Sequence, residues 1–202
     1  MLLIFDMDGT LLDSSLAMLN SVNFAREKLG MELVTKKELE SYLNNKNSPK
    51  SIEVTDEYLK IFKEHYKENC IKNMKLYNGA LDFLQRFQKK YKFAIATNAP
   101  DIYANKMLIH CEISNYFSSI VGANSVKEPK PNPEMIDSIC QTLHVKKNDT
   151  IFIGDSYKDK DAAQNADIEF IFANWGYGQK PEDVKYSASN FAELENIVNQ
   201  IF

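Results

Sequence analysis

The sequence predicts an α/β protein with a doubly wound, Rossmann-like core around a parallel sheet and an inserted all-helical subdomain. Short apolar runs recur along the chain, and each is followed by small or acidic residues and then by a segment with helical periodicity. Such alternation is typical of a parallel sheet with helices on both faces. One long interval, residues 14–78, has no strand-like run, which indicates that a separate helical unit is inserted there.

The apolar runs predict the strands. Continuous apolarity is expected of a strand that is buried on both faces, as in a parallel sheet covered by helices. In chain order, the predicted strands are residues 2–5, 93–96, 119–121, 150–153 and 169–172.

Apolar stripes at helical spacing predict three helices of the core. The stripes are Leu81, Leu84 and Phe87; Met135, Ile136, Ile139 and Leu143; and Leu194, Ile197, Val198 and Ile201. A further helix is expected after the fourth strand.

The interval of residues 14–78 is far longer than a crossover helix requires. It contains three predicted helices, at residues 15–29, 36–44 and 50–73. We therefore expect two parts: an α/β catalytic core formed by residues 1–13 and 79–202, and a helical subdomain formed by residues 14–78.

Composition limits the partners and the cellular location. The chain has 202 residues, with 24 Lys and Arg against 28 Asp and Glu, which gives a formal charge of −4. Nucleic-acid binders usually carry a basic excess, so we expect no nucleic-acid partner. No apolar stretch approaches the roughly 18 to 20 residues that span a bilayer, and the three widely spaced cysteines fit reduced thiols. We expect a cytoplasmic monomer or homodimer with no membrane partner.

Polar side chains gather where the predicted strands end, which is where ligands bind in an open parallel sheet. They are Asp6 and Asp8, Thr97 and Asn98, Lys130, and Asp155 with Asp159. A single aspartate at such a position is more often a helix cap than a catalytic group. Four neighbouring carboxylates, however, repel one another unless a cation or a proton relieves them. The set therefore predicts a metal site.

The donor types indicate which metal and which chemistry. Carboxylate oxygens suit a hard cation, and a site shared with an anionic substrate suits Mg²⁺. Lys130 and the Thr97 hydroxyl would then serve as a counter-charge and a hydrogen-bond donor for phosphate oxygens. Phosphoryl transfer is the predicted chemistry.

These residues resemble, in order, the four motifs of the haloacid dehalogenase-like (HAD) phosphohydrolase superfamily. The motifs are Asp6-x-Asp8-Gly9-Thr10, Thr97-Asn98, Lys130-Pro-x-Pro133 and Gly154-Asp155-Ser156-x-x-Asp159. Residues 14–78 resemble the helical cap of the subgroup that includes phosphoglycolate phosphatases and β-phosphoglucomutases. The segment Trp175-Gly176-Tyr177-Gly178 resembles one found in the phosphoglycolate phosphatase-like branch.

The resemblance implies a Mg²⁺-dependent phosphatase that acts on a small phosphorylated metabolite through an aspartyl-phosphate. By this resemblance, Asp6 is the nucleophile, and Asp8 protonates the leaving oxygen and then takes a proton from the attacking water. Mg²⁺ would be held by the Asp6 side chain, the Asp8 backbone carbonyl and Asp155, with Asp159 ligating directly or through water. Thr97, Asn98 and Lys130 would bind the transferring phosphoryl group.

The same residues leave two alternatives for comparison and exclude a third. A sugar phosphomutase of the β-phosphoglucomutase type would use the same aspartyl-phosphate, and it stays open because the deciding residues lie in the cap. A non-enzymatic module like the receiver domains of two-component systems is remote, because there the acidic pair precedes the phosphoacceptor. Dehalogenation is excluded, because the related dehalogenases lack the second aspartate that Asp8 supplies here.

The helical segment of residues 14–78 carries one aromatic stripe. Tyr58, Phe62 and Tyr66 follow i, i+4, i+8 spacing and share a helix face. We expect them to form the interior of the cap rather than to contact substrate. Hinges for cap movement are expected near residues 13–15 and 77–79.

Overall fold

The computed structural model describes residues 1–44 and 54–202. Its centre is a parallel six-stranded sheet with the order β5-β4-β1-β6-β7-β8. The strands are β1 (Leu2–Phe5), β4 (Lys92–Thr97), β5 (Phe117–Gly122), β6 (Thr150–Gly154), β7 (Glu169–Ala173) and β8 (Tyr186–Ala188). All five predicted strands are confirmed. The short strand β8 was missed, because three residues at the edge of the sheet produce no apolar run.

The register places the ends of the three central strands side by side. Strand β1 lies between β4 and β6, and all four of its residues are buried. Phe5 is opposite Ile95 of β4 and Ile153 of β6. The residues that follow these strands therefore emerge at one edge of the sheet.

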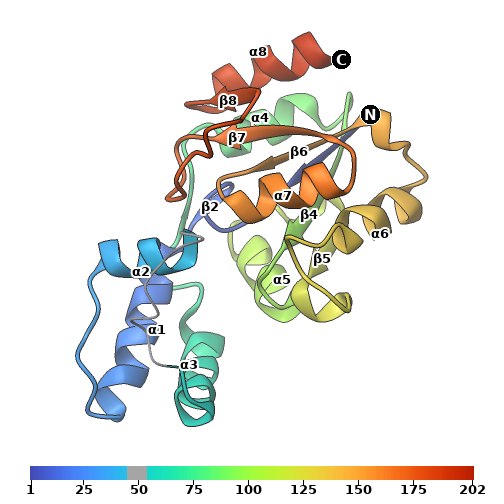
Figure 1. The fold of residues 1–202 in the computed structure, drawn as a ribbon. Coiled ribbons are helices and arrows are strands. Elements are labelled where there is room, and N and C mark those ends of the chain that lie inside the picture. Colours follow the sequence, from blue (N-terminus) through green and yellow to red (C-terminus); the bar gives the residue numbers. More distant parts are fainter. Residues whose placement is uncertain (45–53) are drawn as a thin grey trace.

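Helices cover both faces of the sheet (Figure 1). They are α4 (Ala80–Phe87), α5 (Asp101–His110), α6 (Glu134–Leu143), α7 (Tyr157–Asn165) and α8 (Phe191–Ile201), with short 3-10 turns at Ser114–Tyr116, Ala123–Ser125 and Lys147–Asp149. The three predicted stripes are confirmed as α4, α6 and α8. Helix α5 was missed because its apolar residues do not form a single stripe; Ile102 and Ile109 are exposed.

Successive side chains of β1 point to opposite faces of the sheet, so the buried core is divided between the two faces. Leu3 and Phe5 belong to a cluster with α4, α5 and α8, whereas Leu2 and Ile4 belong to a second cluster with α6 and α7. This two-sided burial is what the continuous apolar runs predict, and it confirms the doubly wound core.

Three helices stand to one side of the sheet (Figure 1): α1 (Ser15–Lys28), α2 (Lys36–Asn44) and α3 (Asp56–Asn69). The first two agree with the predicted ranges. The third begins later than predicted, since Thr55 caps it by accepting a hydrogen bond from the Tyr58 backbone N–H. Residues 50–53 of that prediction lie outside the described residues. None of the helices in the described ranges combines the length and apolar character needed to cross a membrane.

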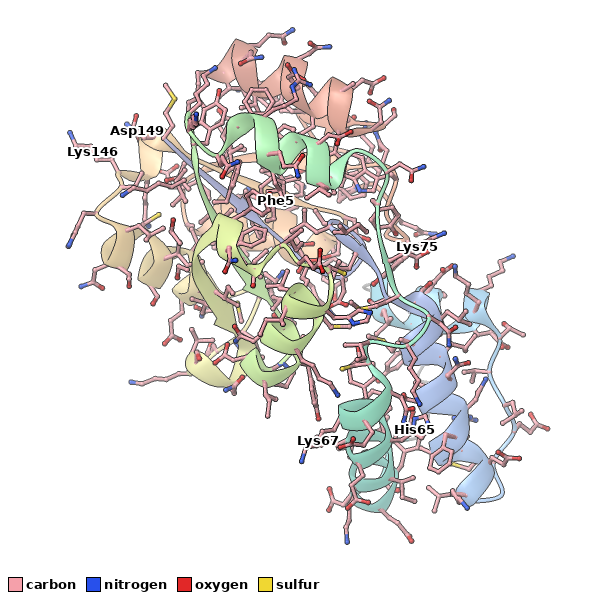
Figure 2. All side chains as sticks on the ribbon, turned by 180° about the vertical axis from the view of Figure 1, so that it is seen from behind. Phe5, His65, Lys67, Lys75, Lys146 and Asp149 are labelled. Carbon is pink, nitrogen blue, oxygen red and sulfur yellow. The ribbon has the colours of Figure 1, made fainter. Side chains whose placement is uncertain are left out.

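The sequence suggested that residues 14–78 contain no strand, but the structure has one there. Strand β3 (Lys75–Leu76) pairs antiparallel with β2 (Leu12–Asp13) and forms a two-stranded ribbon. Two residues per strand are too few to produce an apolar run, so the pattern could not reveal them. Figure 2 shows Lys75 where the chain passes between the three helices and the core, with His65 and Lys67 on α3. The division at residues 13 and 79 stays a prediction.

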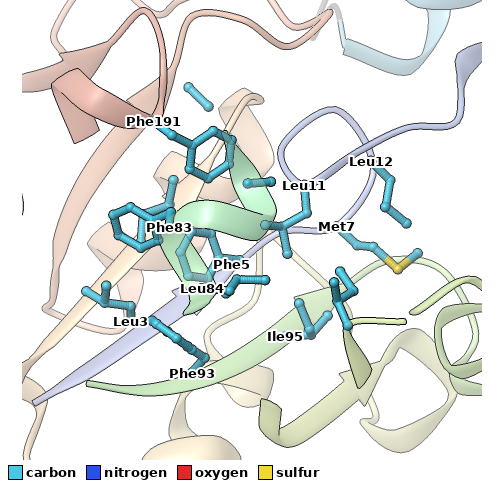
Figure 3. Packing of buried hydrophobic residues seen from close by; sticks show 14 of the residues in the cluster. Leu3, Phe5, Met7, Leu11, Leu12, Phe83, Leu84, Phe93, Ile95 and Phe191 are labelled. Carbon is cyan, nitrogen blue, oxygen red and sulfur yellow. The ribbon is translucent and has the colours of Figure 1, made fainter. Parts of the chain in front are cut away.

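Phe83 of α4 is central to the larger cluster (Figure 3). Its ring lies 6.1 Å from that of Phe5 and 5.7 Å from that of Phe191, measured between centroids. It therefore ties α4 to both the central strand and the C-terminal helix.

Replacing this ring with a methyl group should weaken the core. We expect Phe83→Ala to lower the free energy of unfolding by about 3 to 5 kcal/mol, because the substitution removes buried contacts and leaves a cavity. Gln85→Ala, at an exposed position of the same helix, should change it by less than about 0.5 kcal/mol. Urea denaturation of both variants measures the difference, and equal midpoints would contradict the role of Phe83.

Candidate active site

The seven residues predicted for the site lie together at the carboxyl ends of the strands. They line one cavity of about 260 Å³ and are Asp6, Asp8, Thr97, Asn98, Lys130, Asp155 and Asp159. The aligned ends of β1, β4 and β6 account for this, because they place Asp6, Thr97 and Asp155 at one edge. The convergence was predicted from strand order alone.

Lys130 joins two of the carboxylates. Its buried ammonium nitrogen Nζ lies 2.6 Å from Asp6 Oδ1 and 2.6 Å from Asp159 Oδ1. Burial lowers the pKa of Lys130, but the two carboxylates more than offset this effect and raise it overall. The lysine therefore stays charged and reduces the repulsion among the aspartates.

Asn98 holds the backbone that carries Lys130. The Asn98 side-chain amide donates to the Lys130 carbonyl and accepts from the Lys130 N–H, each at 3.0 Å. The side chain predicted to bind phosphate is thus engaged with the peptide of Lys130. Thr97 is buried, and its hydroxyl oxygen accepts a hydrogen bond of 3.1 Å from the Ala99 N–H.

Asp159 both caps a helix and contacts the lysine. Ser156 is the N-cap of α7, and its side chain and the Asp159 side chain form a capping box. Asp159 Oδ2 accepts from the Ser156 N–H at 3.0 Å and from its hydroxyl at 2.6 Å, which leaves Oδ1 for Lys130. Asp159 therefore takes part in the helix cap and also contacts Lys130 in the cavity; its role in the site stays a prediction.

Asp155 is oriented by a loop that sequence reasoning did not connect with it. Its Oδ2 atom accepts hydrogen bonds of 3.0 Å from the backbone N–H groups of Tyr177 and Gly178. A Cβ atom at Gly178 would lie 1.7 Å from the Asp155 carbonyl oxygen. A Cβ atom at Gly9, whose φ is +90°, would lie 2.3 Å from Asp155 Oδ2. The two glycines around Tyr177 were the available signal, because they allow a backbone to approach a side chain closely.

Asp8 is held by a serine at the start of the helical segment. The hydroxyl of the buried Ser14 donates a short hydrogen bond to Asp8 Oδ1. Burial raises the pKa of Asp8, while this hydrogen bond and the charge of Lys130 act in the opposite direction. Ser14 was not singled out from the sequence, since nothing in its neighbourhood distinguishes it from a helix cap.

Three carboxylates in this cavity form a set that fits a metal ion. One oxygen from each of Asp6, Asp155 and Asp159 lies within 4.8 Å of the others, and all three residues are buried. Burial, opposed by Lys130, raises the pKa of Asp6 to about 7. Burial and the two neighbouring carboxylates raise that of Asp155 well above its usual value. Excess negative charge among hard oxygen donors suits a divalent cation.

Comparison with known proteins places this arrangement in a family. The model of the haloacid dehalogenase-like hydrolases matches residues 3–173. The chain belongs to the haloacid dehalogenase-like hydrolase family. This confirms the resemblance carried by the four motifs.

Relatives of this HAD-like hydrolase match over most of its length. The phosphoglycolate phosphatase of Rhodobacter capsulatus is 29% identical over 205 residues, which cover 95% of this chain and 92% of the relative. That of Aquifex aeolicus (strain VF5) is 27% identical over 181 residues, which cover 87% and 85%. The solved structure of a haloacid dehalogenase-like family protein from Streptococcus pneumoniae matches with a TM-score of 0.85 at 25% identity, over 98% of this chain and 97% of that one.

The enzyme class follows from the family and its curated relatives. The chain is a phosphatase, a phosphoric monoester hydrolase. The non-enzymatic receiver-like alternative is therefore dropped.

The helical segment of this hydrolase also contributes to the cavity. Met18, Leu43, Phe62 and Tyr66 line it. Tyr58, Phe62 and Tyr66 form a stack of nearly parallel rings, with centroids 6.3 and 5.4 Å apart. The expectation that this stripe forms the interior of the cap holds for Tyr58, whereas Phe62 and Tyr66 also face the cavity. Helical spacing shows a shared face but does not show what lies opposite it.

The contact between Gly178 and Asp155 gives a test of the site's construction. We expect Gly178→Ala to lower activity on the order of 100-fold, because the new methyl group must displace the loop that orients Asp155. The free energy of unfolding should fall by about 1 to 3 kcal/mol.

Gly30→Ala is the matched control. Gly30 also has a positive φ, of +67°, but nothing lies within 4 Å of the position of an added Cβ. The free energy of unfolding of this variant should fall by on the order of 1 kcal/mol through backbone strain, and its activity should stay unchanged. Steady-state phosphate release and thermal denaturation separate the two effects. Full activity of Gly178→Ala would mean that the loop does not orient Asp155.

Proposed function

We propose that this phosphatase hydrolyses a small phosphorylated metabolite through an aspartyl-phosphate on Asp6, with Mg²⁺ as its cofactor. The observation that carries the proposal is the position of Lys130 Nζ, 2.6 Å from both Asp6 and Asp159, beside the three-carboxylate cluster. A nucleophile, a counter-charge and a set of metal ligands thus share one cavity.

The metal would be held by Asp6, Asp155 and the backbone carbonyl of Asp8. Asp159 fits an indirect role through water, since both of its oxygens are engaged by Lys130 and Ser156. When bound, Mg²⁺ supplies positive charge that draws the phosphoryl group toward the carboxylates and stabilises charge in the transition state.

Asp6 is the nucleophile of the first step. One of its carboxylate oxygens attacks phosphorus in line with the ester bond; the new bond forms as the bond to the leaving oxygen breaks. Lys130 favours the ionised, nucleophilic form of Asp6, because an ammonium ion at hydrogen-bond distance stabilises the negative charge.

Asp8 moves the protons. It gives a proton to the leaving alkoxide, and it then takes one from the water that attacks phosphorus and breaks the bond to Asp6. The products are the alcohol and inorganic phosphate, and both aspartates return to their starting states. Two observations support this role: burial raises the pKa of Asp8, which favours a protonated carboxyl, and Ser14 fixes its orientation.

Thr97 and Lys130 bind the phosphoryl oxygens beside the carboxylates, at the same strand ends, and Asn98 supports them. The Thr97 oxygen already accepts a bond from the Ala99 N–H, so its hydroxyl hydrogen is available for phosphate. Lys130 contributes charge. Asn98 acts mainly by positioning Lys130 through the paired bonds to its peptide.

The lining of the cavity favours hydrolysis over sugar phosphomutation. A mutase must hold a sugar in two orientations, and sugar hydroxyls require polar partners. In the described part of the helical segment, the side chains that reach the cavity are Met18, Leu43, Phe62 and Tyr66, which offer one hydroxyl among them.

Replacing the nucleophile tests the mechanism. We expect Asp6→Asn to reduce phosphate release by about 1,000-fold or more, because an amide does not attack phosphorus. The melting temperature should stay close to that of the wild type, since the replacement has the same shape and Lys130 keeps its bond to Asp159. Asp82→Asn, on the exposed face of α4, is the control and should be fully active. Wild-type activity of Asp6→Asn would remove Asp6 from its assigned role.

Removing divalent metal tests the cofactor. EDTA should reduce hydrolysis to background, and added Mg²⁺ should restore it, because the carboxylates otherwise repel the phosphate. Calorimetric titration with Mg²⁺ gives a reading independent of turnover: Asp155→Asn should weaken binding by at least about 10-fold. Undiminished hydrolysis after dialysis against EDTA would contradict the proposed site.

A further inference from the structure

The cavity has two chemically different halves. Carboxylates, Thr97 and Lys130 occupy the half at the strand ends. The second half is defined by the lining side chains of the helical segment and of α5, which are mostly apolar or aromatic, with Lys158 beside them: Met18, Leu43, Phe62, Tyr66, Pro100 and Tyr103. The phosphoryl group belongs in the first half, so the second half faces the alcohol portion of the substrate.

The aromatic rings of the second half are held in place without a ligand. The ring of Tyr66 stacks on Phe62 with centroids 5.4 Å apart, and it meets Tyr103 edge to face at 5.3 Å. The Tyr103 hydroxyl donates to the Lys63 carbonyl at 3.3 Å, which links the core helix α5 to α3. A preorganised aromatic wall of this kind binds apolar groups with little loss of side-chain entropy.

A second anionic group on the substrate would find little positive charge in the second half of the cavity to offset its lost hydration. Among the described residues that line the cavity, only Lys130 and Lys158 are cationic. Lys130 is already paired with Asp6 and Asp159. Lys158 Nζ donates to the Leu43 carbonyl at 3.3 Å. A carboxylate bound beside it would have to displace that contact and lose its own hydration.

We propose that the natural substrate is the phosphate monoester of an uncharged, predominantly apolar alcohol, whose hydrocarbon portion packs against Phe62, Tyr66 and Tyr103. This rests on the proposed phosphatase function and specifies its substrate class. The cavity volume of about 260 Å³ is close to the lower end of the range of about 300 to 1,000 Å³ that holds small molecules. It suits an alcohol of about the size of a single aromatic ring.

The first experiment compares two substrates of the wild-type enzyme in the presence of Mg²⁺. Benzyl phosphate and 2-phosphoglycolate both release a primary alcohol, but one carries a ring and the other a carboxylate. We expect kcat/KM for benzyl phosphate to be at least about 10-fold higher, as is usual when a hydrophobic pocket is filled. A preference of similar size for 2-phosphoglycolate would overturn the proposal.

The second experiment tests the aromatic wall. Phe62→Ala should lower kcat/KM for benzyl phosphate by about 10-fold, mainly through KM, while Phe62→Leu retains most of the activity. Acetyl phosphate has almost no hydrocarbon portion, so Phe62→Ala should lower its hydrolysis less than that of benzyl phosphate, and the ratio of kcat/KM for benzyl phosphate to that for acetyl phosphate should fall. Glu64→Ala, an exposed position on the same helix, is the control. Unchanged benzyl phosphate kinetics in a folded Phe62→Ala protein would also overturn the proposal.

The outcomes separate this proposal from the phosphatase function on which it rests. If the wild type prefers 2-phosphoglycolate and Lys158→Met abolishes that preference, the cavity has a carboxylate subsite and the substrate class is wrong, although the chemistry stands. If the wild type releases no phosphate from acetyl phosphate or either ester with Mg²⁺, the proposed function itself fails. Circular dichroism of Phe62→Ala distinguishes loss of binding from loss of fold, and the substrate comparison requires no variant.

Discussion

The ion pairs of Lys130 with Asp6 and Asp159 are the constraint on which the rest of the site depends. Burying an ammonium ion and carboxylates is costly, and the cost is offset only when the groups lie at hydrogen-bond distance and are otherwise satisfied. Two of the three members are accordingly fixed by further partners: Asn98 holds the Lys130 peptide, and Ser156 holds Asp159. A neutral residue in place of Lys130 would leave buried carboxylates with no compensating charge. The strand ends, the helix cap of α7 and the loop that carries Lys130 all converge on this one nitrogen atom.

The sequence predicted those parts of the molecule that depend on local pattern and strand order. Strand β1 was recognisable because burial on both faces demands unbroken apolarity, and Asp6 followed because the end of a central parallel strand is where ligands bind. The contact of Asp155 with Gly178 was not predictable in this way, because it joins residues 23 positions apart through a loop with no periodicity. The β2–β3 ribbon was not predicted for another reason. Its strands are too short to show a pattern in the sequence, and only their pairing defines them.

Three hydrogen bonds between the outer helices and the core use the backbone of those helices, in addition to the ring contact of Tyr66 with Tyr103. Tyr103, Lys106 and Lys158 of the core each donate to a carbonyl group of α2 or α3. Two of these donors are lysines that reach carbonyls in the last turns of α2 and α3, where the helix dipole favours positive charge. Contacts of this type require a helix end at the right place but no particular side chain. The cavity-facing side chains of α1, α2 and α3 take no part in these three hydrogen bonds, although Tyr66 also packs on Tyr103.

The two halves of the cavity also explain how one aspartate could serve both proposed steps. While an apolar alcohol portion lies against Phe62 and Tyr66, it occupies the space opposite the strand ends and keeps bulk water away from the phosphorus atom. In the proposed mechanism, departure of the alcohol would open the position next to Asp8 to water. In the proposed mechanism Asp8 would then be deprotonated, and its hydrogen bond from Ser14 would keep it oriented toward that water. Because the alcohol and the water would occupy the same space, the alcohol would have to leave before the water enters. The proposed mechanism requires no movement of the catalytic groups between the two steps.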